Sequence, residues 1–370
     1  MINMKKFREI MSLSIKITAA VLAAAFCLTR TETVKSAVYE AVTRCLTVII
    51  PSLYGMMIMS GFLVKSNIIG RIPRTVTKPG KLLFGMNGSV FPIFLFSMFA
   101  GYPIGAKMLC SEYERRNLSK KAAALFAGVC YGAGPAFIFG CISSQIYGSS
   151  AAGRLILISA VGANLLLAFS LSFGMKKKIS EEHGCGKLNL SANILTESIL
   201  SGGRSIADIC IMITAFSVLT AFLQETGVIS LAGRLISQLT DVSPENGEGL
   251  TLAFLDVTAV GGLEKNNYGL LPAICGLTSF GGLCVIMQIA ALTSGRLSIK
   301  PLVFMRAAAA ILSAVICRML MPYMLAEETV SAAEISFAAH REPSPVPSLL
   351  LILMTVFLFR EYEKLGRRSS

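Results

Sequence analysis

Seven apolar stretches constrain the fold of this 370-residue chain more than any other feature. An α-helix needs about 20 mostly apolar residues to cross the hydrocarbon core of a bilayer. The stretches that meet this length are 10–29, 42–64, 122–142, 154–174, 205–224, 269–293 and 301–325. The shorter run 346–359 is almost purely apolar and a basic tail follows it, so we count it as an eighth span.

The amino-acid composition also favours a lipid bilayer as the environment of the chain. Hydrophobic residues make up 54% of the chain and charged residues only 15%, whereas about a quarter of a typical soluble domain is charged. We therefore predict an all-α, multi-pass integral membrane protein that lies in a lipid bilayer. The first stretch follows Lys5, Lys6 and Arg8, which is typical of a cleaved signal peptide or an uncleaved signal anchor. Because further apolar stretches follow, we interpret it as an anchor.

Two more apolar stretches are interrupted by residues that break helices. Residues 89–110 contain two prolines and two glycines, and residues 249–263 contain Asp256 and the pair Gly261 and Gly262. Irregular backbone at membrane depth is tolerated only where protein or water satisfies its polar groups. We predict that both stretches are re-entrant or broken helical hairpins.

The chain has a net charge of +13, and the distribution of its basic residues indicates which loops face the cytoplasm. Lys and Arg gather between the apolar stretches, and cytoplasmic loops carry an excess of these residues. With both termini cytoplasmic and neither hairpin crossing, the clusters at 5–8, 65–81, 115–121, 176–204, 296–300 and 360–368 all face the cytoplasm. Because the charge is divided among short loops and forms no single stripe, no nucleic acid partner is expected.

A weak internal repeat divides the chain. An offset of about 160 residues places 49–67 over an apolar run ending at 228, and a competing offset near 180 places 91–107 over 271–287. The charge pattern inverts one half relative to the other, and inverted repeats with broken helices are typical of secondary transporters. We expect a signal-anchor helix and outer loop in 1–40, a first half in 41–175, a basic cytoplasmic linker in 176–204, a second half in 205–325, and an outer loop, last helix and basic tail in 326–370.

Four short stretches break apolar helices and form the candidate solute-binding site; they are 101–107, 131–135, 256–262 and 279–282. Glycine and proline can leave backbone groups unpaired within the membrane, and free helix N-termini favour carboxylate or phosphate groups. The alternative is that these small residues only allow close helix packing. The candidate residues are Gly101, Tyr102, Pro103, Gly105, Lys107, Gly134, Pro135, Asp256, Thr258, Ser279, Gly281, Gly282 and Gln288.

Ionisable and amide side chains within apolar stretches each have two interpretations. Lys107 either neutralises an anion or extends to the cytoplasmic interface. Asp256 binds a proton, a cation or a solute hydroxyl, or it caps a helix. Gln288 and Asn164 are ligands or interhelical hydrogen-bonding groups. The arginines in such stretches are interpreted as interfacial or paired; they are Arg44, Arg306 and Arg318.

No enzyme, metal or cofactor site is expected. The sequence has no GxxxxGK[ST], HExxH or GxSxG motif, and its two histidines, His183 and His340, lie in loops. Nine of the ten cysteines lie in or beside apolar stretches and are interpreted as buried hydrophobic residues. The tenth, Cys185, is next to His183 at a spacing that no standard zinc site uses.

Four stretches of sequence resemble a known family. Residues 99–142, which contain FAGYPIGAK and YGAGP, are similar to the signature of YlbJ-like sporulation integral membrane proteins, part of the wider nucleoside-recognition or Gate group. So are 49–64, 252–264 and 279–289, in the same order. The chain departs from the family at 130–133, where Asn residues are usual, at Asp256, where Glu is usual, and at 283–286, where Ser and His are common.

The resemblance implies a function that the residues alone do not. It implies a transporter that is needed in sporulation and moves a small anionic or heteroaromatic solute, with dipicolinic acid as the candidate. The alternatives are a transporter of nucleoside-type solutes and a non-transporting assembly factor in the sporulation membrane. The expected partners are a small-molecule solute and lipid, and a homo-oligomer stays open.

Overall fold

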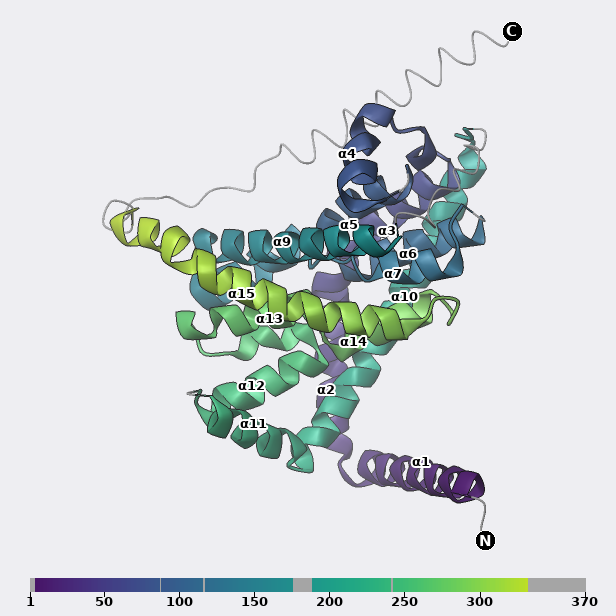
Figure 1. Ribbon diagram of the computed structural model, residues 1–370. Coiled ribbons are helices and arrows are strands. Elements are labelled where there is room, and N and C mark those ends of the chain that lie inside the picture. Colours follow the sequence, from purple (N-terminus) through teal and green to yellow (C-terminus); the bar gives the residue numbers. More distant parts are fainter. Residues whose placement is uncertain (1–3, 87, 116, 176–187, 241, 332–370) are drawn as a thin grey trace. The chain divides into compact units, whose positions relative to one another are not determined.

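The computed structural model describes residues 4–86, 88–115, 117–175, 188–240 and 242–331 (Figure 1). Within these ranges every regular element is a helix, which confirms the all-α prediction. The chain divides into a large unit, Met1–Pro322, and a small unit, Tyr323–Ser370. The predicted span 346–359 and most of the basic linker lie outside the described residues.

The first part of the chain begins with the long helix α1 and then contains two further long helical stretches with shorter helices between them. The elements are α1 (Met4–Thr29), α2 (Thr31–Arg44), η1 (Cys45–Ile49), α3 (Ile50–Lys65), η2 (Ile69–Arg71), α4 (Arg74–Phe84), α5 (Val90–Ala100), α6 (Tyr102–Glu114), α7 (Lys120–Ala127), α8 (Pro135–Phe137), η3 (Ile138–Tyr147) and α9 (Ser150–Met175). Here η1 and η3 are π-helices, and α2, η1 and α3 follow one another without a gap.

The second part has a similar order of elements. They are α10 (Ala192–Glu225), α11 (Val228–Leu239), α12 (Pro244–Leu255), η4 (Val257–Gly262), η5 (Tyr268–Leu270), α13 (Leu271–Phe280), α14 (Gly282–Leu292) and α15 (Ile299–Ser331). Each part runs from a long helical stretch through a short amphipathic helix and two interrupted helices to another long helix. The offset between matching elements is roughly 150 to 160 residues, close to the shorter of the two predicted offsets.

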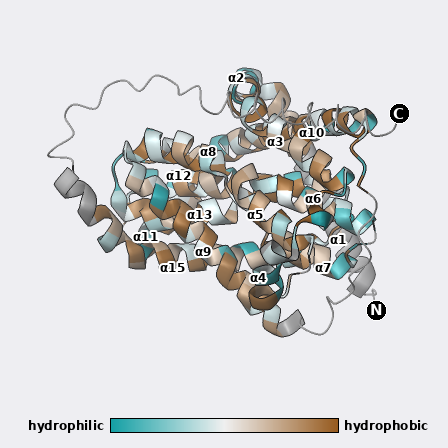
Figure 2. Cartoon of the chain, turned by 90° about the horizontal axis from the view of Figure 1, so that it is seen from above, coloured by the Kyte–Doolittle hydropathy of each residue, from teal (hydrophilic) through white to brown (hydrophobic). Residues whose placement is uncertain are grey.

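Among the described residues, five helical stretches are long and apolar enough to cross a bilayer. They are Thr31–Lys65, Ser150–Phe173, Ala192–Glu225, Tyr268–Leu292 and Ile299–Leu325. Each overlaps a predicted span, and Figure 2 shows hydrophobic residues along most of the labelled helices. These findings confirm a membrane-embedded protein, whereas the count of eight spans stays a prediction. Helix α1 covers the predicted anchor 10–29.

The predicted span 122–142 is not one continuous helix. The chain leaves α7 after Ala127 and resumes a helix at Pro135. Proline has no backbone N–H to donate and suits the first turn of a helix. The intervening loop packs closely on α5, because a Cβ atom on Gly132 would lie 3.0 Å from the carbonyl oxygen of Ser97. The predicted break at 131–135 therefore interrupts the predicted span 122–142.

The two predicted hairpins do contain helix breaks. Gly101, with φ of +100°, separates α5 from α6 in a conformation that L side chains rarely adopt. Helix α12 ends at Leu255, and a 3-10 helix follows Asp256. A further break at Gly281, with φ of +85°, separates α13 from α14 inside the predicted span 269–293.

Small residues let the long helices approach closely. Helix α10 packs along α2 and α3, where a Cβ atom on Gly61 would lie 3.5 Å from the side chain of Ser198 and one on Gly202 would lie 3.2 Å from that of Ile58. Such contacts are typical of helix pairs in membranes. Helix α10 of the second part thus packs on α3, which in turn contacts α5 and α6 on either side of the break at Gly101.

Candidate solute-binding site

Two tyrosines hold the carboxyl end of α13. The hydroxyl of Tyr102, in the first turn of α6, donates a 2.7 Å hydrogen bond to the carbonyl oxygen of Thr278. The hydroxyl of Tyr131, in the loop between α7 and α8, donates a 2.8 Å bond to the carbonyl oxygen of Phe280. The last carbonyls of a helix have no partner inside the helix. These bonds therefore stabilise the end of α13 beside its break.

Arg306 of α15 binds the carbonyl that lies between those two. Its side chain is 0% exposed, and Nη1 donates to the carbonyl oxygen of Ser279 over 3.2 Å. Nη2 donates to Oδ1 of Asn164 over 2.7 Å, and the guanidinium carbon lies 4.6 Å from the ring centre of Tyr131. No Asp or Glu in the described chain forms an ion pair with Arg306. The partial negative charge of the α13 carboxyl end faces this cation and offsets it in part.

Several polar atoms in this region have no partner within the described residues. They are Nε of Arg306, Oγ1 of Thr278 and Oγ of Ser279. A buried polar atom without a hydrogen bond costs about 1–3 kcal/mol. Hydrogen bonds to the last carbonyl groups of α13 thus stabilise the break at Gly281. The hydroxyl groups of Thr278 and Ser279 beside it have no hydrogen-bond partner among the described residues.

A pocket of about 120 Å³ lies next to this network. Its walls come from η1 and α3, the α5–α6 break, the loop into α8 and η3, α10, the α12–η4 break and α14. The lining is mainly apolar, and its polar side chains are Ser52, Tyr102, Asp256, Thr258 and Gln288. A cavity of this kind needs only about 10–15 Å³ for one water molecule, so the pocket has room for a small solute.

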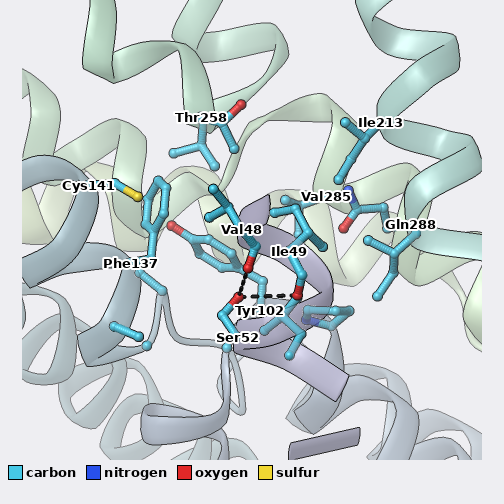
Figure 3. Close-up of a pocket in the computed structure, with 18 of the residues that line it drawn as sticks. Val48, Ile49, Ser52, Tyr102, Phe137, Cys141, Ile213, Thr258, Val285 and Gln288 are labelled. Atoms are coloured by element: carbon cyan, nitrogen blue, oxygen red, sulfur yellow. Dashed lines mark hydrogen bonds between the residues drawn. The ribbon is translucent and has the colours of Figure 1, made fainter. Parts of the chain in front are cut away.

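Figure 3 shows the ring of Tyr102 in the middle of the pocket lining, with Phe137, Thr258 and Gln288 around it. Ser52 is turned back to its own helix and donates to the carbonyl oxygen of Val48 over 2.7 Å. Two of the first-half elements that line the pocket are π-helices, η1 and η3. Irregular helical turns of this type are frequent at functional sites.

Asp256 both caps a helix and lines the pocket. Its Oδ1 accepts a 3.0 Å hydrogen bond from the backbone N–H of Thr258, which caps η4. Nη1 of Arg44 lies 3.6 Å from Oδ2 of Asp256 and donates to Oγ1 of Thr258 over 2.6 Å. The carboxylate is therefore paired with one arginine, from the end of α2. Arg44, Asp256 and Thr258 link the two parts of the chain at the pocket.

Seven of the thirteen predicted site residues line this pocket. The structure brings together Gly101, Tyr102, Pro103, Gly134, Asp256, Thr258 and Gln288. They come from both parts of the chain and from three of the four predicted breaks. Solute binding by these residues stays a prediction.

The other six predicted residues do not line it; they are Gly105, Lys107, Pro135, Ser279, Gly281 and Gly282. Gly105 lets α6 pack against the carbonyl oxygen of Cys130, and Gly281 leaves room for the hydroxyl of Tyr131. Nζ of Lys107 lies 3.4 Å from the carbonyl oxygen of Ser201 in α10. These glycines fit the close-packing alternative, and Lys107 is directed to another helix.

The network around Arg306 was not predicted as part of the site. Its partner Asn164 lies 142 residues away along the chain, and its contact with Ser279 is to a backbone carbonyl. No local motif therefore marks either partner. The available signal was the arginine itself, because a charged residue near the bilayer centre costs about 2.5–3.5 kcal/mol on insertion scales. Arg44, which was interpreted as interfacial or paired, is paired with Asp256.

No protein-family model, curated protein or solved structure matches the chain in comparisons with known proteins.

Proposed function

We propose that this chain is a membrane transporter for a small anionic or heteroaromatic solute that binds in the pocket at the helix breaks. The observation that carries the proposal is that one pocket is lined by breaks from both parts of the chain, at Gly101, Gly134 and Asp256. Secondary transporters bind their solutes near the middle of the membrane, between repeats and at discontinuous helices. We further propose that the two parts form inverted repeats, with eight spans and both termini cytoplasmic.

Electrostatics favours an anion. Asp256 is paired with Arg44, whereas Arg306 has no carboxylate partner in the described chain and lies against Tyr131. The ring of Tyr131 is 5.1 Å from that of Tyr102, which lines the pocket. The N-terminus of α6 also begins at the pocket, and helix N-termini carry partial positive charge. Two arginines and one aspartate leave an excess of positive charge near the site.

The apolar and aromatic lining favours a flat ring. Tyr102 and Phe137 have ring centres 6.3 Å apart and both line the pocket, as does Phe99. Together with the positive charge, these rings suit an aromatic carboxylate. Dipicolinate, which the family resemblance names, has this chemistry, and a nucleoside would use the rings and Gln288 without the charge.

The pocket also supports a transporter over a membrane assembly factor. A scaffold has no need for polar groups that converge on one cavity, whereas Asp256, Thr258 and Gln288 do so here. Deleting the gene from the source organism and measuring the dipicolinate content of its spores distinguishes a transporter from an assembly factor. A transporter of dipicolinate predicts spores with little dipicolinate, restored by the parent gene but not by a variant with a blocked pocket. Restoration by the blocked variant would favour the assembly factor.

A further inference from the structure

Basic residues lie at the starts of two helices that border a second pocket. Lys120 and Lys121 begin α7, and Lys300 is the second residue of α15. The two helix starts lie together, because Arg296 forms an ion pair with Glu114, shortly before α7. A Cβ atom on Gly128, just after α7, would also lie 2.7 Å from the Met305 sulfur in α15.

The pocket between these helix starts is open and shallow, with a volume of about 340 Å³. Lys120, Lys121 and Ser298 line it together with Ala124, Leu125 and Pro301. Both lysines are exposed, and no described residue forms a hydrogen bond or ion pair with either of them. Their charges are therefore available to a ligand.

Both helices change from basic to apolar within about one turn. In α7 the two lysines are followed by Ala124 and Leu125, and in α15 Lys300 is followed by Phe304, which is 76% exposed. Residues three or four apart share one face of a helix, so Phe304 lies on the same face as Pro301 and Lys300. Basic groups above exposed apolar groups are typical of the boundary between lipid headgroups and hydrocarbon.

We propose that this second pocket binds the phosphate headgroup of an anionic phospholipid. Lys120 and Lys121 contact the phosphate, and an acyl chain follows the apolar floor towards Phe304. A free phosphate ion would gain nothing from Leu125 or Pro301, whereas a lipid uses the charged and the apolar groups together. The site is separate from the solute pocket and does not depend on the proposed transport.

The chain contains no tryptophan, so Phe304→Trp introduces a single tryptophan beside the pocket, which can be excited apart from the tyrosines. The protein is reconstituted in phosphatidylcholine vesicles that contain brominated phosphatidylglycerol or brominated phosphatidylcholine, and quenching is compared. We expect stronger quenching by the anionic lipid. Quenching measured against the fraction of brominated lipid gives the affinity of the site for phosphatidylglycerol relative to phosphatidylcholine. In the K120Q/K121Q background this relative affinity should fall by roughly 10- to 30-fold, since each basic residue near the surface contributes about fivefold.

The control is R234Q/K265Q, which removes the same charge at two exposed positions outside the pocket; it should keep the preference. Three results would overturn the proposal. One is equal quenching by the two lipids. Another is an equal loss of preference in both double variants, which would indicate net charge alone. The third is full competition by millimolar glycerol phosphate, which would indicate a site for free phosphate.

Discussion

The hydroxyl of Tyr102 donates a 2.7 Å hydrogen bond to the carbonyl oxygen of Thr278. This bond joins a residue that lines the solute pocket to the end of α13, 176 residues along the chain. The break at Gly281 follows three residues later. An anion or ring that moved Tyr102 would therefore disturb the end of α13, so the bond offers a direct physical link between the pocket and a helix break in the other part of the chain.

Tyr102→Phe should destabilise the protein by about 1 kcal/mol, because one interhelical hydrogen bond is lost and the carbonyl of Thr278 is left without this donor. Thermal unfolding in detergent measures the change. Tyr39→Phe is the matched control, since Tyr39 is 73% exposed. An unchanged midpoint for Tyr102→Phe would show that the bond contributes nothing to stability.

Arg306→Lys should destabilise the protein more, by about 2–4 kcal/mol. Lysine keeps the charge but has no planar fork, so it cannot bind the carbonyl of Ser279 and the amide of Asn164 together or stack on Tyr131. Leaving buried acceptors unpaired costs about 1–3 kcal/mol each. Arg318→Lys, at an exposed position of the same helix, should change the unfolding midpoint little. Equal midpoints for the two variants would contradict the role given to Arg306.

Asp256→Asn should lower solute uptake while leaving membrane insertion intact. The amide keeps the shape of the side chain but removes the charge that pairs with Arg44. Asp208→Asn, an exposed position on α10, is the control and should transport normally. Lys107→Ala should have a smaller effect than Asp256→Asn, because Lys107 does not line the pocket. The reverse order of effects would place the site elsewhere.

The proposed topology places residue 150 outside and residue 121 in the cytoplasm. Ser150→Cys should therefore react with a membrane-impermeant maleimide in intact cells, whereas Lys121→Cys should react only after permeabilisation. The parent chain measures the background from its own cysteines. Labelling of Lys121→Cys in intact cells would show that the orientation is wrong.

Much of the fold could be predicted because it depends on local pattern. Apolar length located the five candidate spans, and glycine and proline located the breaks at Gly101 and Gly134. Hydropathy alone predicted one span over 122–142, whereas the glycines and proline at 132–135 marked the break that the structure shows inside it. That turn depends on close packing of the loop against α5, which involves residues some 30 positions earlier.

The site was predicted in part for the same reason. Residues at the breaks, such as Asp256 and Gly134, are marked by their own sequence context. Arg306 acts on backbone carbonyls of α13 and on Asn164, which is 142 residues away. A carbonyl group carries no side-chain signature, so no sequence motif could show that this arginine and two tyrosines hold one helix end.

Uptake by proteoliposomes tests the central claim most directly. Ala136 lines the pocket, so Ala136→Phe should fill it, whereas Ala207→Phe places the same ring at an exposed position on α10 outside the pocket. With labelled dipicolinate and a labelled nucleoside as solutes, we predict that the parent and Ala207→Phe take up dipicolinate and that Ala136→Phe does not. Uptake by Ala136→Phe at the parent rate, or no uptake of either solute by the parent, would contradict the account.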